Sequence, residues 1–396
     1  SMKLSLGDRY MKVSGIHKSL FGENYRKVWS AKTTFPVLKL SAADLKPKEL
    51  GGGMQTHSLR LTDNQQKEWV FRSIEKYPAN IFPEALRTTF VAGILKDNVT
   101  ATFPYAALTV PVFSDALGVP HSNPAIVYIV PDKKLGIYSR DFANTINLFE
   151  EREPLGKSIS TLKMIAALKE DNDNEMNQKA YLIARLQDIF LGDWDRHGDQ
   201  WKWVDVKKGK GKTFKGVPRD RDQVFYVNQG LFPKILALPW IMPKFQGFGS
   251  KIKNVNALSF NARFIDGIFT NKLSKEDWKI TTDFAVKSLT DSVIETALKK
   301  MPSEIFETTH LELERQLKER RQDLFRKTPR YYRFLNKVID ITTSDKREMV
   351  TLKDTLNGRL AVKISKISKN KQVGKLLLSR VLEPPTNKEM RLYLHG

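Results

Sequence analysis

The chain has 396 residues, of which 41% are apolar and 28% charged, and this composition predicts an ordered, soluble protein of two or more lobes. Its net charge of +22 favours anionic partners, but charge alone does not choose among nucleotides, nucleic acid, anionic lipid and polysaccharide. The lack of cysteine excludes disulfides, thiolate catalysis and cysteine-based zinc sites, and no apolar run reaches the roughly 20 residues of a membrane helix.

The N-terminal part of the chain contains strand-like segments around a glycine-rich turn. The turn at 51–55 stands directly before an alternating segment at 58–61, and a second strand-like segment follows at 68–74. Most glycine runs are only flexible turns, but glycines also let a backbone approach phosphates and offer N–H groups to them. The pattern predicts a nucleotide-binding hairpin whose contacts come from Gly51, Gly52, Gly53, Gln55 and one of the two basic residues Arg72 and Lys76.

The segment 83–96 is predicted to be a helix, because Leu86, Phe90 and Ile94 repeat at i+4 spacing. Pro83 suits the first helical position. Glu84 lies in the first turn, where an acidic residue stabilises the positive end of the helix dipole. The same carboxylate is also placed to pair with the basic residue of the preceding strand, and the sequence supports both roles equally.

Two apolar strands follow, at 125–130 and at 147–154, and the second ends in charged residues and Pro154. A strand of this kind can offer backbone groups to an adenine ring while the chain crosses between lobes. We therefore expect Glu150 and Glu151 at a hinge. The expected small lobe, with its N-terminal extension, spans residues 1–153.

The helix predicted at 178–191 leads into the turn that contains Asp195 and His197. Gln200 follows five residues after Asp195, and the carboxylates of Asp220 and Asp222 arrive after roughly 20 more residues. Phosphoryl transfer needs one carboxylate to orient the attacking hydroxyl, and an amide and a carboxylate to hold magnesium. Acidic turns after helices are also common as solvated loops, and a single histidine is more often structural than catalytic.

The C-terminal half is predicted to begin with helices, at 274–287, 291–300 and 303–327. From about residue 350 the pattern changes to strand-like alternation, as in 359–364 and 375–381. We expect a helical large lobe at 154–345 and a small β module at 346–396, which would be the start of a further domain.

Taken in order, the glycine-rich hairpin, acidic helix, hinge strand, Asp-Arg-His turn and acidic cluster resemble the HipA-type and phosphoinositide-kinase-like branch of the protein-kinase-like fold, over roughly residues 50–300. The resemblance implies an α+β, two-lobed fold and an atypical kinase that uses ATP and Mg²⁺ or Mn²⁺, with an acceptor that is unknown. It assigns catalysis to the turn with Asp195 and His197. It assigns the metal to Gln200 and Asp222, with Asp220 beside them.

Two departures from that pattern leave a second reading open. Arg72 takes the strand position where a phosphate-binding lysine is expected, and Gln200 replaces the usual asparagine. Either change is compatible with a catalytically degenerate, pseudokinase-like scaffold that binds nucleotide or displays a basic surface to an anionic glycan or lipid. Sequence-specific nucleic-acid binding is a weaker reading, because no RNA-binding, zinc-finger or helix-turn-helix motif is present.

A further resemblance concerns the cell compartment. The segment 51–55, with Lys39, Tyr25 and Trp29 upstream, is similar to a central domain of large Bacteroidetes outer-membrane-associated proteins that also carry a calcineurin-like phosphoesterase domain. The resemblance implies a piece of a longer protein of the periplasm or outer membrane, with a protein, lipid or glycan acceptor and an anionic component of the cell envelope as the expected partners.

Overall fold

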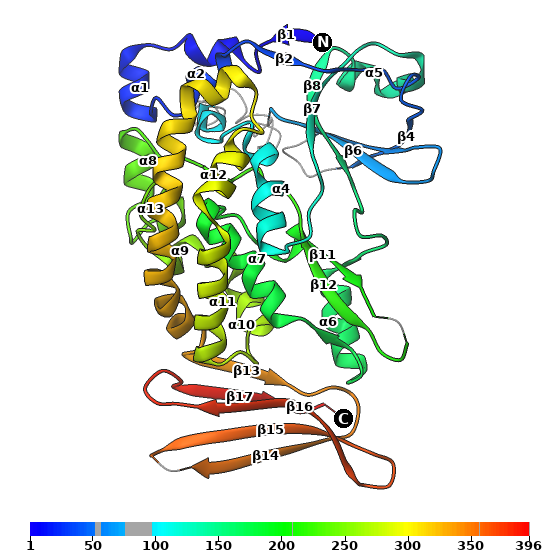
Figure 1. The fold of residues 1–396 in the computed structure, drawn as a ribbon, viewed down its shortest axis with the longest axis vertical. Helices are drawn as coiled ribbons and strands as arrows, with labels where there is room; N and C mark the ends of the chain where they lie inside the picture. Colours follow the sequence, from blue (N-terminus) through cyan, green and yellow to red (C-terminus); the bar gives the residue numbers. More distant parts are fainter. Residues whose placement is uncertain (52–56, 76–96, 208, 356, 396) are drawn as a thin grey trace, which may run out of the picture.

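The computed structural model describes residues 1–51, 57–75, 97–207, 209–355 and 357–395. The sheet-rich lobe lies in the upper part of the molecule beside the helices α12 (Asp291–Leu298) and α13 (Ser303–Leu335), which belong to a larger helical lobe, and a small β module lies at the end opposite the N-terminus (Figure 1). The α+β fold predicted from the sequence, with a β-rich small lobe, a helical large lobe and a C-terminal β extension, is therefore confirmed.

The small lobe is built on a six-stranded sheet. The side chains of β5 and β6 point alternately to the two faces of the sheet, so Leu59, Leu61 and Phe71 are fully buried on one face. Leu135 and Phe142 pack against them in the same hydrophobic cluster. The strands are, in spatial order, β3 (Val37–Leu38), β7 (Ala125–Ile129), β8 (Thr145–Glu151), β6 (Glu68–Ser73), β5 (Ser58–Thr62) and β4 (Lys46–Gly51). The buried face is covered by η5 (Lys133–Tyr138) and α5 (Ser139–Phe142).

The N-terminal extension packs beside this sheet. A separate two-stranded sheet joins β1 (Met2–Leu4) to β2 (Thr33–Phe35). Within the N-terminal extension, the side chain of Trp29 is buried against Tyr10 and Val99. The helical elements of this region are η1 (Asp8–Met11), α1 (Gly15–Phe21), α2 (Arg26–Ser30) and η4 (Asn98–Ala101).

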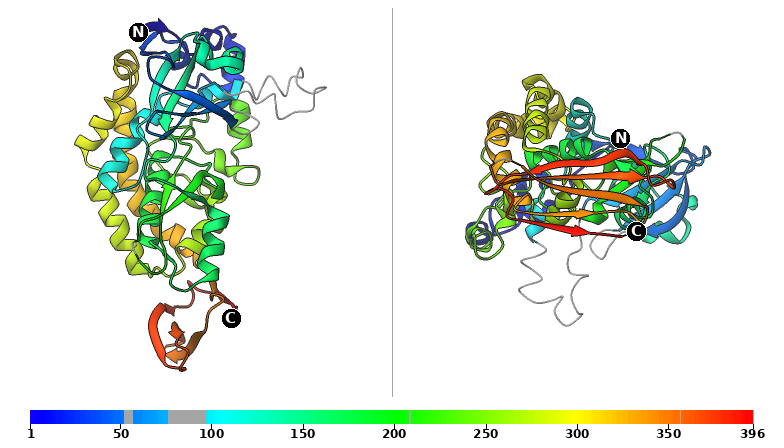
Figure 2. Two further views of the ribbon diagram at one scale, coloured as in Figure 1. Left: turned by 90° about the vertical axis from the view of Figure 1, so that its right-hand side faces the viewer. Right: turned by 90° about the horizontal axis from the view of Figure 1, so that it is seen from below.

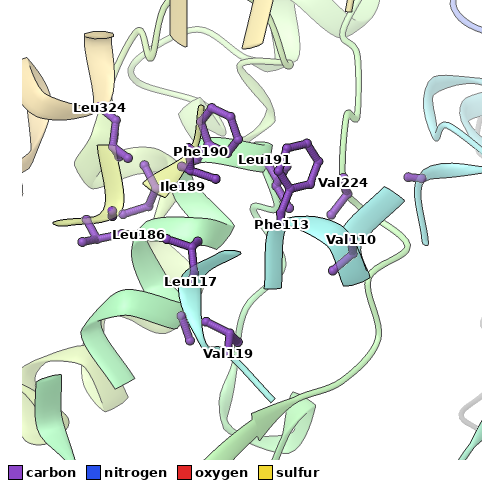
Figure 3. Packing of buried hydrophobic residues seen from close by; sticks show 14 of the residues in the cluster. Val110, Phe113, Leu117, Val119, Leu186, Ile189, Phe190, Leu191, Val224 and Leu324 are labelled. Atoms are coloured by element: carbon purple, nitrogen blue, oxygen red, sulfur yellow. The ribbon is translucent and has the colours of Figure 1, made fainter. Parts of the chain in front are cut away.

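The large lobe is a set of helices around one continuous core. Phe113 of α4, Phe190 of α7 and Leu324 of α13 meet there, and all three are fully buried (Figure 3). The major helices are α4 (Ala106–Leu117), α6 (Thr161–Glu170), α7 (Gln178–Leu191), α11 (Lys275–Ser288), α12 (Asp291–Leu298) and α13 (Ser303–Leu335). Shorter ones are α8 (Leu231–Leu236), η7 (Pro243–Phe245), α9 (Val255–Leu258), η8 (Phe260–Ala262) and α10 (Arg263–Phe269).

The helix α13 is longer than the predicted segment 303–327, because it continues through Pro329 to Leu335. A proline inside a helix removes a backbone hydrogen bond. In this helix Tyr331 and Tyr332 follow it, and both are buried against Trp278. The burial of two aromatic side chains offsets the missing hydrogen bond, and the helix persists.

A second sheet packs against α6 and α7 in the large lobe. Its order is β10 (Glu175–Met176), β12 (Thr213–Pro218), β11 (Trp201–Asp205) and β9 (Ile159–Ser160). The chain leaves the small-lobe sheet at Glu151 and enters this sheet at Ile159, so residues 152–158 form the crossing between the lobes. The hairpin of β11 and β12 follows η6 (Gly198–Gln200) directly.

The C-terminal module contains a parallel pair, β13 (Val338–Thr342) with β17 (Glu389–Tyr393), and an antiparallel sheet of β14 (Glu348–Thr355), β15 (Arg359–Ile367) and β16 (Val373–Leu382). Its first strand begins at Val338, ahead of the expected boundary at 346, because that strand pairs with the last strand of the chain. The module lies below the helical lobe and close to α10 and α11 (Figures 1 and 2). Within the described residues, no helix combines the length and apolar character needed to cross a bilayer.

Candidate active site

The loop that carries Asp195 is positioned by the end of α7. The side chain of Asn177 accepts a hydrogen bond from the backbone N–H of Ala180 and caps the start of this helix. Gly192 ends it with a positive φ of 73°. A Cβ atom at Gly192 would lie 2.9 Å from the ring of Phe248, so both the backbone angle and the packing require glycine there.

Arg196 fastens this loop to the end of β12. Its side chain is 1% exposed, and its NH1 atom donates to the side-chain oxygen of Gln200 at 2.9 Å. The same nitrogen donates to the backbone oxygens of Arg219 at 2.6 Å and of Asp220 at 3.0 Å. The backbone N–H of Arg219 in turn donates to the backbone oxygen of Gln200 at 2.8 Å. Gln200 and Asp220 are therefore held side by side.

The carboxylate of Asp195 is half-buried and accepts a hydrogen bond from the side chain of Asn261. The Nδ2 atom of Asn261 donates to its Oδ1 atom at 2.7 Å. The Oδ1 atom of Asn261 accepts a hydrogen bond from the ammonium group of Lys244 at 3.2 Å. That ammonium group also lies 5.2 Å from the ring centroid of Trp194, which is a cation–π contact. Asp195 thus belongs to a chain of polar contacts that leads toward the surface.

The small lobe contributes an ion pair opposite this loop. Arg72 of β6 places its Nε atom 3.1 Å from the Oε1 atom of Glu150 on the adjacent strand β8. Ser122 donates to the other carboxylate oxygen of Glu150 at 2.6 Å. Burial alone would lower the pKa of Arg72, but Glu150, followed by Asp220 and Asp222, raises it. Arg72 is therefore a firmly charged cation beside three carboxylates.

The backbone of Asp220 is itself unusual, because its φ angle is +58°. Residues other than glycine rarely adopt this left-handed conformation, and it recurs where a site holds a side chain in a required direction. The strand β12 ends at Pro218, two residues earlier. The carboxylate of Asp220 thus projects from the point where the sheet ends and the lobes meet.

Two clefts meet at this point. One, of about 730 Å³, is open to solvent and is lined by Arg72, Gln200, Asp220 and the crossing residues Arg152 and Ser158. Its small-lobe wall consists of one sheet face, since Ser58 pairs with Arg72 and Arg60 with Val70 in the strand register. The second, of about 930 Å³, is lined by Glu150, Asp222 and apolar side chains of α4. Arg72, Arg219 and Asp220 line both clefts.

Beneath the loop lies a buried network of charges. Asp188 of α7 is fully buried and contacts three guanidinium groups, those of Arg185 at 2.6 Å, of Arg196 at 3.3 Å and of Arg221. Arg185 also binds Asp266 of α10 at 2.9 Å. Burial, and secondarily Arg185, lowers the pKa of Arg221 to about 9. The network ties the loop with Asp195 to the core of the large lobe.

Asp193 is the exception in this network. Its Oδ2 atom lies 3.7 Å from NH1 of Arg196 and of Arg221, and neither carboxylate oxygen makes a hydrogen bond to the described residues. Burial raises the pKa of this carboxyl to about 7, while Arg196 opposes the shift. The negative charges of nearby carboxylates, Asp222 foremost, add to the increase. Asp193 is therefore protonated over much of the acidic range.

Several residues that the sequence predicts for the site do meet. The crossing region and loop bring together Gln200, Asp220, Arg72 and Glu150 around the two clefts, and Asp222 lines the second of them, whereas Asp195 stands on the same loop outside the described lining of both. Gly51 ends β4, where a Cβ atom would lie 3.1 Å from the side chain of Ser58. The remaining predicted contacts lie outside the described residues, and these are Gly52, Gly53, Gln55, Lys76 and Glu84.

Besides Asp195 and Gly51, two more predicted residues are absent from the described lining of the clefts. His197 is half-exposed, is not among the described lining residues, and has its Nδ1 atom 3.7 Å from a carboxylate oxygen of Asp199. Glu151 lies at the end of β8 opposite Trp69, and it too is absent from the described lining of either cleft. Sequence reasoning missed Asn261, Lys244 and the bridging role of Arg196. Polarity among apolar neighbours was the one available signal for Asn261 and Lys244, whereas Arg196 stood inside the recognised Asp-Arg-His turn.

Within the described residues, no group of three or more histidine, aspartate or glutamate side chains could hold a metal ion. Magnesium rarely depends on such a group, since it commonly binds one or two protein carboxylates and completes its shell with water and substrate phosphates. Gln200 and Asp220 supply oxygen atoms of the required kind on one wall of the open cleft. The donor set therefore fits a metal that arrives with a nucleotide.

No protein-family model and no curated protein matches the chain. Two similar solved structures are the proinflammatory kinase CtkA of Helicobacter pylori and a Rio2 kinase–ADP/Mg²⁺–phosphoaspartate complex from Chaetomium thermophilum. The first is 11% identical, with 75% of this chain and 99% of that chain covered and a TM-score of 0.37. The second is 12% identical, with 66% and 74% covered and a TM-score of 0.28. At these TM-scores the similarities carry no argument about activity.

Proposed function

We propose that this chain is an atypical, HipA-like kinase that uses ATP with Mg²⁺ or Mn²⁺ to phosphorylate a hydroxyl group. One observation carries the proposal. Arg196 binds the amide of Gln200 and the backbone of Arg219 and Asp220 at once, so the loop with Asp195 is locked against the end of β12. Phosphoryl transfer depends on this arrangement, because it relies on positioning and charge rather than on covalent chemistry by the protein.

The open cleft is the proposed nucleotide site. Arg152 and Ser158 line it from the crossing between the lobes, and we place the base of the nucleotide beside this crossing. Arg72 supplies a positive charge to phosphates from the small-lobe sheet, and its guanidinium group can bind two phosphate oxygens. Glu150 holds that guanidinium group in place at 3.1 Å.

Gln200 and Asp220 would hold the divalent cation, which supplies neutralisation of the negative charge on the phosphates. The side-chain oxygen of Gln200 accepts one hydrogen bond from Arg196, and a carbonyl oxygen has a second lone pair. The sequence assigned the main ligand role to Asp222. The lining of the open cleft favours Asp220 for that role, and Asp222 would act from the neighbouring cleft.

Asp195 would orient the acceptor hydroxyl and accept its proton as the bond to phosphorus forms. Its hydrogen bond from Asn261 fixes the direction of the carboxylate and leaves the second oxygen for the acceptor. His197 is placed on the same loop with its side chain toward solvent, and we assign no proton transfer to it.

A second candidate function is nucleotide binding without transfer, as in a pseudokinase-like scaffold. The observation that favours it is the engagement of Gln200 by Arg196, which removes part of the capacity of this amide for a metal. Arginine in place of lysine at position 72 also favours binding without transfer, because the two side chains differ in reach and in hydrogen-bond geometry.

A thermal-shift experiment tests the proposed site. We expect ATP with Mg²⁺ or Mn²⁺ to raise the Tm more than ATP or metal alone, because a ligand that binds only the folded state stabilises it. Asp220→Asn should lose the increment that the metal adds, whereas Asp141→Asn, which removes an exposed carboxylate on α5, should keep it. If wild type shows no shift with any nucleotide, both candidate functions are wrong.

A further inference from the structure

The segment between Asp222 and Asp266 has an unusual charge pattern. It contains no acidic residue, although the whole chain has 44 acidic residues among 396. It contains five basic residues, which are Lys234, Lys244, Lys251, Lys253 and Arg263. A stretch of this length with charges of one sign favours an anionic partner.

The same segment exposes large apolar side chains on α8 and the turns after it. Trp240 is the extreme case, with 77% of its surface exposed, whereas the other six tryptophans are buried or half-buried. The exposed apolar residues, which we call the 231–242 surface, are Leu231, Phe232, Ile235, Leu236, Trp240, Ile241 and Met242. A contiguous patch of this kind marks a site for a protein or a membrane.

Polar contacts of the backbone hold this segment on the large lobe. The side chain of Asn228 donates to the backbone oxygen of Pro233 at 3.0 Å and also to that of Phe245, on the far side of the surface. Gly230 packs so closely on α1 that a Cβ atom would lie 2.4 Å from the backbone nitrogen of Gly22. The main chain is therefore anchored at both ends, while the apolar side chains between these anchors remain exposed.

We propose that the 231–242 surface docks on an anionic lipid bilayer and inserts its apolar side chains at the boundary between headgroups and acyl chains. Tryptophan and aliphatic residues flanked by lysine are typical of segments that lie at a membrane interface. Protein–protein interfaces, by contrast, are depleted of lysine. The lack of any acidic residue over 223–265 adds attraction to a negatively charged leaflet and removes repulsion from it.

The docking surface adjoins the proposed active site. Lys244 follows the surface in sequence and donates to Asn261, which donates to Asp195. A bilayer in contact with this surface would therefore lie near the side of the cleft from which an acceptor approaches Asp195. Membrane docking itself does not depend on phosphoryl transfer, so the two proposals fail independently.

Vesicle sedimentation with the full chain tests the proposal. We expect binding to vesicles that contain phosphatidylglycerol, and weak binding to vesicles of phosphatidylcholine alone. Binding to the anionic vesicles should fall as salt is raised, because surface charges are screened beyond roughly 10 Å at 0.1 M salt. On binding, the fluorescence of Trp240 should shift to shorter wavelength, and Trp240→Phe should abolish that shift while keeping most of the binding.

A matched pair of variants isolates the surface. The double variant Trp240→Ser with Ile241→Ser should weaken binding by about tenfold or more, since two inserted side chains are lost. Leu311→Ser removes a side chain that is 73% exposed on α13, and it should leave binding unchanged. All of these positions are exposed, so the variants should keep the wild-type Tm, which is measured in parallel.

Two outcomes would overturn the proposal. Unchanged vesicle binding by the double variant would assign the interaction to the general basic charge of the chain. Self-association of wild type without vesicles, abolished in the double variant, would instead make the 231–242 surface an interface between copies of the chain.

Discussion

The side chain of Asn261 donates a hydrogen bond of 2.7 Å to the carboxylate of Asp195, although the two residues lie 66 positions apart in the chain. Asn261 belongs to the short helix η8, just before α10, and Asp195 to the loop after α7. The contact joins the loop to the helical part of the large lobe. It engages the Oδ1 atom of that carboxylate and leaves Oδ2 outside this contact.

The first prediction concerns Asn261. Asn261→Ala should lower kcat by about tenfold with little change in the KM for ATP, because the carboxylate loses its orienting partner but remains in place. Asn256→Ala on α9 is the control. Equal kcat values for wild type and Asn261→Ala would remove this residue from the site.

The second prediction concerns Asp195 itself. Asp195→Ala should lower phosphoryl transfer, or autophosphorylation where no acceptor is known, by about 10²–10⁴-fold. Nucleotide binding should stay nearly intact, because the carboxylate acts in the transition state and adds little to ground-state affinity. Asp141→Ala is the control, since that carboxylate is exposed on α5 and is absent from the described lining of both clefts. Loss of the fold in Asp195→Ala would assign the residue to structure instead.

The third prediction concerns Arg72. Arg72→Ala should weaken ATP binding by about tenfold and AMP binding much less, because the guanidinium group is expected on the distal phosphates. Arg72→Lys should retain binding of ATP only in part, since lysine cannot reproduce two parallel hydrogen bonds. Calorimetry with both nucleotides measures the difference. The same loss for ATP and AMP would place Arg72 away from the distal phosphates.

The fourth prediction concerns pH and Asp193. Its carboxyl has a pKa of about 7 in the folded protein and an ordinary value of 3.8, so the folded state binds the proton more tightly. The contribution of this carboxyl to the free energy of unfolding is fully present below pH 4 and is lost as the pH rises toward 7. Asp193→Asn keeps the neutral form at every pH, and it should therefore raise the Tm relative to wild type more at pH 8 than at pH 5. A Tm difference that does not change with pH would contradict this assignment.

Local patterns in the sequence determined the secondary structure around the site. The helix 178–191 was predicted with the bounds that α7 has, because its apolar spacing and its Asn177 cap act within a few residues. The hairpin of β5 and β6 followed from short-range alternation in the same way. The five-residue spacing from Asp195 to Gln200 is also local, and it predicted the loop that precedes β11.

Only the tertiary structure decided which side chains meet in the site. Gln200 lies beside Asp220 because a buried Arg196 bridges them, and Asn261 reaches Asp195 from a distant helix. The sequence could not show that Asp220 lines both clefts and Asp222 only the second, because a left-handed backbone at Asp220 turns the chain after β12. Such contacts arise from the packing of segments far apart in the chain, and no local periodicity encodes them.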